Sequence, residues 1–240
     1  MKAMLLAAGR GQRMMPLTEA LPKPLLEVGG KPLVVWQIEA LVAAGIVDLV
    51  VNHAWKGDVL EEALGDGSRW GARIAWSREN PALETGGGIA TALALLEADG
   101  HANEPFIVAS ADVYSDFDYR RLASVAAAIR AHHPLHAAHL VLVPNPPWHP
   151  AGDMALVDGL IARTAPAAAP GASLLTYANI GVFHPRVFDG VQRHHVQKLF
   201  PWAYTLADAR RMTGEVHSGE WANVGTPDQL AELDGRMRDA

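Results

Sequence analysis

Short apolar runs alternate with helical patterns from the N-terminus to Val143. The runs expected to be strands are Met4–Ala8, Val47–Asn52, Arg73–Ser77, Phe106–Ala109 and Leu140–Val143. They lack a regular alternation of apolar and polar positions, which is typical of parallel strands covered on both faces. The segments expected to be helices are Pro32–Ala44, Asp58–Leu64, Gly87–Ala98 and Asp118–Ala131. This order predicts an α/β fold with a Rossmann-like, mostly parallel central sheet and helices on both faces.

The pattern changes after Pro144, where several prolines up to Pro150 predict a loop. The Ala- and Pro-rich segment from Thr164 to Gly171 is expected to be an exposed connection. Further strands are expected at Met154–Val157, Leu174–Phe183 and Glu215–His217, followed by a helix from Thr226 to Arg238 with Thr226 as its N-cap. We therefore expect a mixed or antiparallel second half within a single domain that spans residues 1–240.

The amino-acid composition excludes cysteine-based sites and argues against nucleic-acid and membrane partners. The absence of cysteine excludes disulfides, thiolate metal sites and cysteine nucleophiles, and it agrees with a cytoplasmic location. The formal net charge of -6 argues against nucleic-acid partners, which favour a basic face. No apolar run approaches the roughly 20 residues that span a bilayer, so no membrane partner is expected. The oligomeric state is not indicated by the sequence.

A glycine-rich loop follows the first expected strand, in the run from Leu6 to Met14. Its small residues let the backbone approach a ligand closely, and successive N–H groups can bind phosphate oxygens. The run lacks the third glycine of a dinucleotide fingerprint and the Gly-Lys-Ser/Thr of a Walker A loop, so an ordinary turn is the alternative. Two cationic side chains, Arg13 in this run and Lys23 after it, favour the binding of a triphosphate. The expected nucleotide-binding residues here are Ala7, Ala8, Gly9, Gly11, Gln12, Arg13 and Lys23.

A carboxylate follows the expected strand Phe106–Ala109, in the run Ser110-Ala111-Asp112. Ligands of open α/β sheets bind beyond the carboxyl ends of the strands, and carboxylate oxygen is a ligand that Mg²⁺ prefers. The alternative is a solvated aspartate that caps the turn. Asp112 is therefore the expected Mg²⁺ ligand.

These motifs together resemble the signature of the sugar-phosphate nucleotidyltransferases. The matching runs are Leu6–Met14, Pro22-Lys23-Pro24-Leu25, Glu84-Thr85-Gly86-Gly87-Gly88, Asp112 and Trp221–Thr226. The resemblance implies a glycosyltransferase-A-like fold with a nucleotide-binding half at about 1–113 and a sugar-binding half at about 114–240. It also implies a Mg²⁺-dependent condensation of a nucleoside triphosphate with a sugar 1-phosphate, which releases pyrophosphate. Arg13, Lys23 and Asp112 would be the catalytic residues.

The resemblance also assigns roles to residues outside the loop. Asn223 would be the second Mg²⁺ ligand, and Asn52, Gly86 and Gly87 would lie near the nucleotide. The residues expected to bind the sugar substrate are Glu84, Ser110, Asp153, Asn179 and Lys198.

Two positions depart from the family pattern. Asn223 stands where relatives typically carry aspartate, and Ser110 stands where family members carry asparagine. An amide oxygen can still coordinate Mg²⁺, but one negative charge is lost. A catalytically weak nucleotide-binding regulator is therefore an alternative.

Two segments, Asn52–Trp55 and Gly65–Arg69, are most similar to those of family members that use UTP and N-acetylmuramate 1-phosphate in cell-wall recycling. Glucose 1-phosphate with dTTP, mannose 1-phosphate with GTP, or a choline phosphate with CTP remain alternatives. The loop chemistry is the same for all of them.

The histidines between His132 and His139 are spaced around Pro134, which prevents the regular helix that a zinc-binding face needs. We expect them to be solvated surface residues.

Overall fold

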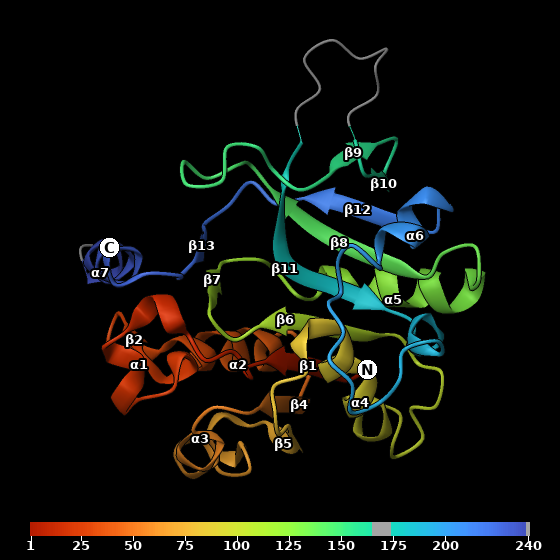
Figure 1. The fold of residues 1–240 in the computed structure, drawn as a ribbon. Coiled ribbons are helices and arrows are strands. Elements are labelled where there is room, and N and C mark those ends of the chain that lie inside the picture. Colours follow the sequence, from red (N-terminus) through yellow and green to blue (C-terminus); the bar gives the residue numbers. More distant parts are fainter. Residues whose placement is uncertain (165–173, 239–240) are drawn as a thin grey trace.

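Buried strands assemble into one nine-stranded sheet in the computed structural model, which describes residues 1–164 and 174–238. The strand order is β5-β4-β1-β6-β11-β8-β12-β10-β9 (Figure 1). The five strands expected before Pro144 are all present, with ends that differ by one or two residues. The strands are β1 Ala3–Leu6, β4 Asp48–His53, β5 Arg73–Arg78, β6 Phe106–Ser110, β8 Ala138–Val143, β9 Ala155–Val157, β10 Leu160–Ala162, β11 Thr176–Phe183 and β12 Met212–Val216.

The sheet is parallel in its first part and mixed in its second. β5, β4, β1 and β6 run parallel, with Ala3 of β1 between Leu49 and Ile107. β11 lies antiparallel between β6 and β8, whereas β12 runs parallel to β8. The predicted α/β fold class is therefore confirmed. The sheet continues through both proposed halves, and their functional division and the single-domain assignment stay predictions.

Residues of β1 alternate between two hydrophobic cores, one on each face of the sheet. Ala3 and Leu5 pack with side chains of α2, α3 and α5, whereas Met4 packs with those of α4 and α6. Because both faces are covered, the strands read as apolar runs without alternation. The helices are α1 Leu17–Ala20, α2 Leu33–Ala43, α3 Gly57–Leu64, α4 Glu84–Leu96, α5 Arg121–His132, α6 Tyr204–Asp208 and α7 Pro227–Arg238.

Two short strand pairs lie outside the large sheet, and neither is predicted from the sequence. They are β2 (Glu27–Val28) with β3 (Lys31–Pro32), and β7 (Val113–Ser115) with β13 (Trp221–Asn223). The second pair places Asn223 opposite Val113, the residue after Asp112. It therefore brings the motif Trp221–Thr226 beside the end of β6.

The final helix packs on a third core near the N-terminal loop. Leu233 of α7 joins Met14, Leu33 and Val224 there. Thr226 Oγ1 accepts a hydrogen bond from Gln229 N at 3.3 Å, which confirms the predicted N-cap.

The histidines from His132 to His139 have different surroundings. His132 is exposed, but His139 on β8 is buried, with Nδ1 2.8 Å from Thr213 Oγ1 and Nε2 3.4 Å from Glu215 Oε1. The expectation of a solvated surface residue is wrong for His139, because β8 lies inside the sheet between β11 and β12. No group of three or more histidine or carboxylate side chains in the described part of the chain could hold a metal ion.

A pair of stacked histidines makes the stability of the fold depend on pH. The rings of His133 and His184 stack with centroids 3.8 Å apart, and burial lowers the pKa of His184 to about 4. The unfolded chain binds this proton more tightly, with a pKa of about 6.5. The contribution of neutral His184 is therefore complete above pH 6.5 and is lost as the pH falls toward 4. We expect this residue to lower the free energy of unfolding by about 2 kcal/mol between pH 7.5 and pH 5.

Urea unfolding at the two pH values measures this loss in the wild type and in His184→Gln. The variant has no titrating group at this position. Its free energy of unfolding should therefore fall by about 2 kcal/mol less than that of the wild type between pH 7.5 and pH 5. Exposed His132→Gln serves as the control and should lose as much as the wild type. Equal losses in all three proteins would contradict the prediction.

The helices of the described residues include none with the length and apolar character needed to cross a membrane. The predicted exposed connection from Thr164 to Gly171 lies, beyond Thr164, outside the described residues. The cytoplasmic location stays a prediction.

Candidate active site

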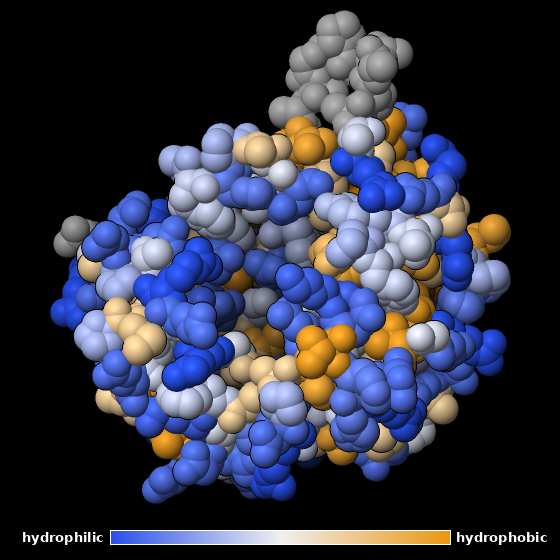
Figure 2. All heavy atoms as spheres, viewed as in Figure 1, coloured by the Kyte–Doolittle hydropathy of each residue, from blue (hydrophilic) through white to orange (hydrophobic). Residues whose placement is uncertain are grey.

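Four adjoining cavities lie beyond the carboxyl ends of the parallel strands, and each shares lining residues with the next. Their volumes are about 490, 350, 280 and 320 Å³. Asp112 lines the first two, Glu84 and Ser110 line the second and third, and Asn179 lines the third and fourth. Figure 2 shows a hollow near the middle of this face, with a rim of mostly hydrophilic residues. A row of cavities lined by both polar and apolar residues suits an extended ligand that carries polar groups.

The glycine-rich loop forms the wall of the first cavity. Gly11 adopts a φ of 65°, a conformation that favours glycine, and its carbonyl accepts a hydrogen bond from Thr18 Oγ1 at 2.9 Å. Ala8 lines the second cavity instead. The structure thus brings the predicted loop and both predicted cations to one place. The predicted residues that line the first cavity are Ala7, Gly9, Gly11, Gln12, Arg13, Lys23 and Asp112.

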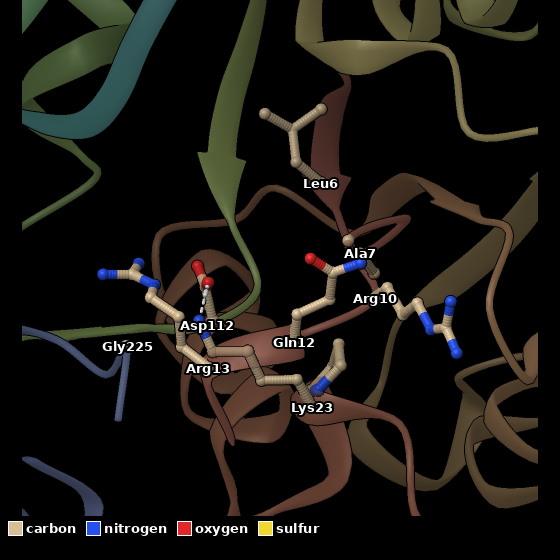
Figure 3. Close-up of a pocket in the computed structure, with 11 residues that line it drawn as sticks. Leu6, Ala7, Arg10, Gln12, Arg13, Lys23, Asp112 and Gly225 are labelled. Atoms are coloured by element: carbon tan, nitrogen blue, oxygen red, sulfur yellow. Dashed lines mark hydrogen bonds and ion pairs between the residues drawn. The ribbon is translucent and has the colours of Figure 1, made fainter. Parts of the chain in front are cut away.

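Lys23 and Asp112 point toward one another across the first cavity and form an ion pair (Figure 3). Lys23 begins the 3-10 helix Lys23–Leu25, and Pro22 and Pro24 restrict the backbone on either side of it. Lys23 is buried, whereas 30% of the Asp112 side chain is exposed. The cavity therefore presents a cation in a fixed position beside a carboxylate that an incoming ligand can reach.

A buried hydrogen-bond network supports the glycine-rich loop. Asn52 Oδ1 accepts a hydrogen bond from Ala7 N at 2.8 Å, and Asn52 Nδ2 donates one to Glu79 Oε1 at 2.7 Å. Glu79 Oε2 accepts a third from Leu83 N at 2.8 Å, and burial raises the pKa of Glu79. Asn52 thus positions the loop, while it also lines the second cavity. Its contact with a nucleotide stays a prediction.

Gly86 and Gly87, in the first turn of α4, line none of the four cavities. Gly87 N donates a hydrogen bond to Gln197 O at 2.9 Å, and a Cβ atom on Gly87 would lie 2.0 Å from His195 O. A Cβ atom on Gly86 would lie 2.9 Å from Gln197 O. In this structure the two glycines therefore let the segment 195–198 pass close to the helix. Their predicted contact with the nucleotide stays a prediction.

The residues predicted to bind the sugar line the second, third and fourth cavities. Asn179 lies at an irregularity of β11 and has a φ of 58°. The Asp153 carboxylate already accepts two hydrogen bonds, from His149 Nε2 at 2.9 Å and from Tyr177 N at 2.8 Å. The third cavity is lined by Glu84, Ser110, Asn179 and Lys198, and the fourth by Asp153, Asn179 and Asn223.

The N-terminal part of the chain, residues 2–150, matches the family model described as Nucleotidyl transferase. The chain belongs to the nucleotidyl transferase family. It is 44% identical to N-acetylmuramate alpha-1-phosphate uridylyltransferase of Neisseria meningitidis serogroup B, over 97% of this chain and 96% of the relative. It is 30% identical to a mannose-1-phosphate guanyltransferase of Schizosaccharomyces pombe, over 95% of this chain and 61% of that relative.

Solved structures show the same fold as this nucleotidyl transferase at low sequence identity. A putative glucose-1-phosphate thymidylyltransferase from Bacillus anthracis matches with a TM-score of 0.81 at 19% identity, over 100% of this chain and 96% of its own. An apo UDP-glucose pyrophosphorylase matches with a TM-score of 0.75 at 18% identity, over 100% and 99% of the two chains.

The predicted metal ligands of the nucleotidyl transferase are Asp112, in the turn between β6 and β7, and Asn223 on β13, the strand that pairs with β7. Besides the β7–β13 pairing, Val224 N donates a hydrogen bond to Asp112 O at 3.2 Å. Carboxylate and amide oxygens are hard ligands, and Mg²⁺ commonly takes few protein ligands beside phosphate and water. This donor set fits Mg²⁺, although Asp112 lines the first two cavities and Asn223 the fourth.

Several cavity residues of the nucleotidyl transferase are missed by the sequence reasoning. Arg10 lies in the loop motif, and its guanidinium is 4.5 Å from the ring centroid of Trp55. Gly225 belongs to the last motif and lines the first cavity. His149 and Tyr177 line the fourth cavity but carry no motif, and only the folded chain brings them together.

Proposed function

We propose that this nucleotidyl transferase joins UTP to N-acetylmuramate 1-phosphate, giving a UDP-sugar and pyrophosphate. The observation that carries the proposal is the 44% identity to a relative of that name along nearly the whole chain. In the reaction, an oxygen of the sugar 1-phosphate attacks the α-phosphorus of UTP. The bond between that phosphorus and the oxygen shared with the β-phosphate breaks, and pyrophosphate leaves. Such transfers need positioning and charge neutralisation rather than a covalent enzyme intermediate.

The first cavity would hold the triphosphate. Gly9 and Gly11 allow close backbone approach, and Lys23 neutralises charge on the α-phosphate. Arg13 binds the β- and γ-phosphates, for which its planar donor fork is well suited. The contact of Asn52 with Ala7 N keeps this loop in place while the charges rearrange. The ion pair with Asp112 holds the Lys23 ammonium group in the first cavity, where the α-phosphate would bind.

Asp112 and Asn223 would hold Mg²⁺ in the proposed reaction. When bound, the ion supplies positive charge to the phosphates of both substrates. Asp112 is the only one of the two ligands that carries a negative charge. Its carboxylate would therefore supply all the negative charge that these two ligands bring to the ion.

The third and fourth cavities would hold the sugar 1-phosphate. Lys198, in the third cavity, lies where it can neutralise the sugar phosphate, and Glu84, Ser110 and Asn179 offer oxygen and amide partners for hydroxyls. Asp153, whose carboxylate accepts hydrogen bonds from His149 Nε2 and Tyr177 N, forms part of the wall of the fourth cavity.

A guanylyltransferase that uses mannose 1-phosphate is the second candidate, because two mannose-1-phosphate guanyltransferases are 30% and 29% identical to this chain over 95% of its length. A weakly active regulator that binds nucleotide is a third, because of Asn223 and Ser110. Both candidates make distinct predictions in one assay.

The test is Mg²⁺-dependent pyrophosphate release from UTP, GTP, CTP and dTTP, each combined with several sugar 1-phosphates. We expect the highest kcat/KM with UTP and N-acetylmuramate 1-phosphate, by about 100-fold over other pairs. Preference for another pair would overturn the substrates and keep the chemistry. Nucleotide binding without release in any pair would favour the regulator.

A further inference from the structure

The loop that carries Trp148 and His149 forms a rigid wall of the fourth cavity. Asn145 Nδ2 donates hydrogen bonds to Pro150 O at 3.1 Å and to Leu174 O at 2.8 Å, which fix both sides of the loop. Trp148 stacks on His149 and on Trp221, with ring centroids 6.0 and 6.2 Å apart. The Trp148 residue is still half-exposed. Its ring therefore offers an apolar platform at the edge of the cavity.

His149 is held in one orientation by Asp153. Asp153 Oδ1 accepts a hydrogen bond from His149 Nε2 at 2.9 Å, and Oδ2 is bound by Tyr177 N. Because a carboxylate only accepts, the hydrogen of a neutral His149 ring must lie on Nε2. Nδ1 has no hydrogen-bond partner within residues 1–164 and 174–238. That nitrogen accepts a hydrogen bond when the ring is neutral, and it donates one with a positive charge when the ring is protonated.

The charge of the fourth cavity depends on this histidine. The cations near the phosphates are Arg10, Arg13 and Lys23 in the first cavity and Lys198 in the third. In contrast, the described residues that line the fourth cavity include no lysine or arginine. His149 is therefore the one lining residue of that cavity that can become positive.

We propose that His149 recognises the carboxylate of the acidic ether substituent that distinguishes N-acetylmuramate from N-acetylglucosamine. This assignment rests on the proposed function. Asn179 lines both the third and the fourth cavity. With the sugar phosphate near Lys198 in the third cavity, the sugar ring extends past Asn179 into the fourth cavity. Trp148 covers the apolar edge of the ring and substituent, and the imidazolium of His149 donates Nδ1–H to the carboxylate. Asp153 is a positioning residue for this contact.

The other groups near His149 that can ionise supply no positive charge to the fourth cavity. Tyr177 of β11 and Tyr204 of α6 line the same cavity, and burial raises the pKa of both. Arg163 lies over the Tyr204 ring and pairs with Asp208. Asp153 is the remaining charged neighbour, and it is already bonded to His149. A preference for the acidic sugar that depends on His149 therefore reports the His149–Asp153 pair.

The experiment measures kcat and KM for N-acetylmuramate 1-phosphate and N-acetylglucosamine 1-phosphate with UTP at one fixed pH. In His149→Gln we expect the KM for the muramate to rise about ten-fold or more, with kcat and the KM for the glucosamine nearly unchanged. The ratio of the glucosamine KM to the muramate KM should therefore fall in the variant, which a merely structural role of His149 would not produce. Exposed His132→Gln should behave as the wild type, and thermal unfolding should show that His149→Gln folds.

Two results would distinguish a failure of the His149 assignment from a failure of the proposed function. If the wild type prefers the muramate but His149→Gln raises both KM values equally or neither, the assignment of His149 is overturned and the proposed function stands. If the wild type releases pyrophosphate with neither acceptor, the proposed function and this assignment both fall. A preference for the muramate that is lost in His149→Gln, with the KM for the glucosamine unchanged, supports both.

Discussion

Asp112→Asn is expected to lower kcat for pyrophosphate release by about 100- to 1,000-fold. The substitution keeps the shape of the side chain and removes its charge. Asn223 is already neutral, so the proposed Mg²⁺ site would then lack a negative ligand. Lys23 would also lose its ion-pair partner. Steady-state kinetics over a range of Mg²⁺ concentrations measures the effect. The loss should persist at saturating UTP, because it affects the phosphoryl transfer more than nucleotide binding.

Asp116→Asn is the matched control for Asp112→Asn. Asp116 lies four residues later and pairs with His217 at 2.8 Å, and it lines none of the four cavities. Its activity should stay within about two-fold of the wild type, as for most exposed substitutions. Wild-type kcat in Asp112→Asn would overturn both the metal-binding and the catalytic role of that residue. A comparable loss in both variants would indicate a general effect of charge instead.

Sequence reasoning was most successful where the signal is local. The apolar run that becomes β1 and the glycine-rich loop after it are contiguous, so their hydrophobic pattern and glycine spacing predict a strand followed by a loop, and the structure places that loop in the wall of the first cavity. Phosphate binding by the loop stays a prediction. Asp112 likewise follows directly on β6. The family signature added Asn223, which the β7–β13 pair brings beside Asp112 through a contact that spans half the chain.

Where tertiary contacts decide, the sequence could not give the answer. Asn52 could be placed at a strand end, but its partner Glu79 belongs to no motif, and the hydrogen bonds between them form only in the folded chain. His139 has a polar side chain of the kind usually found at the surface, yet it is buried because β8 lies inside the sheet. His149 acquires its neighbours from α6, β11 and β13, which follow it in the chain at variable distances. No periodic pattern encodes such neighbours.

Gly87→Ala is expected to lower the free energy of unfolding by about 1–3 kcal/mol, since the new Cβ atom would overlap His195 O. Relief of this overlap must move the segment 195–198, which carries Lys198 into the third cavity. The KM for the sugar 1-phosphate should therefore rise while the KM for UTP changes little. Urea unfolding and steady-state kinetics with each substrate varied in turn measure the two effects.

The same variant distinguishes two roles for this glycine. If Gly87 serves close approach of a nucleotide, as the family resemblance implies, the KM for UTP should rise more than the KM for the sugar 1-phosphate. The matched control is Gly235→Ala in α7, where an added Cβ atom meets nothing within 4 Å. Because alanine favours a helix over glycine by about 1 kcal/mol, the control should be unchanged or slightly more stable. Equal stability of the two variants would contradict the steric argument. A rise in the KM for UTP alone in Gly87→Ala would indicate that the glycine serves nucleotide binding and not the packing of segment 195–198.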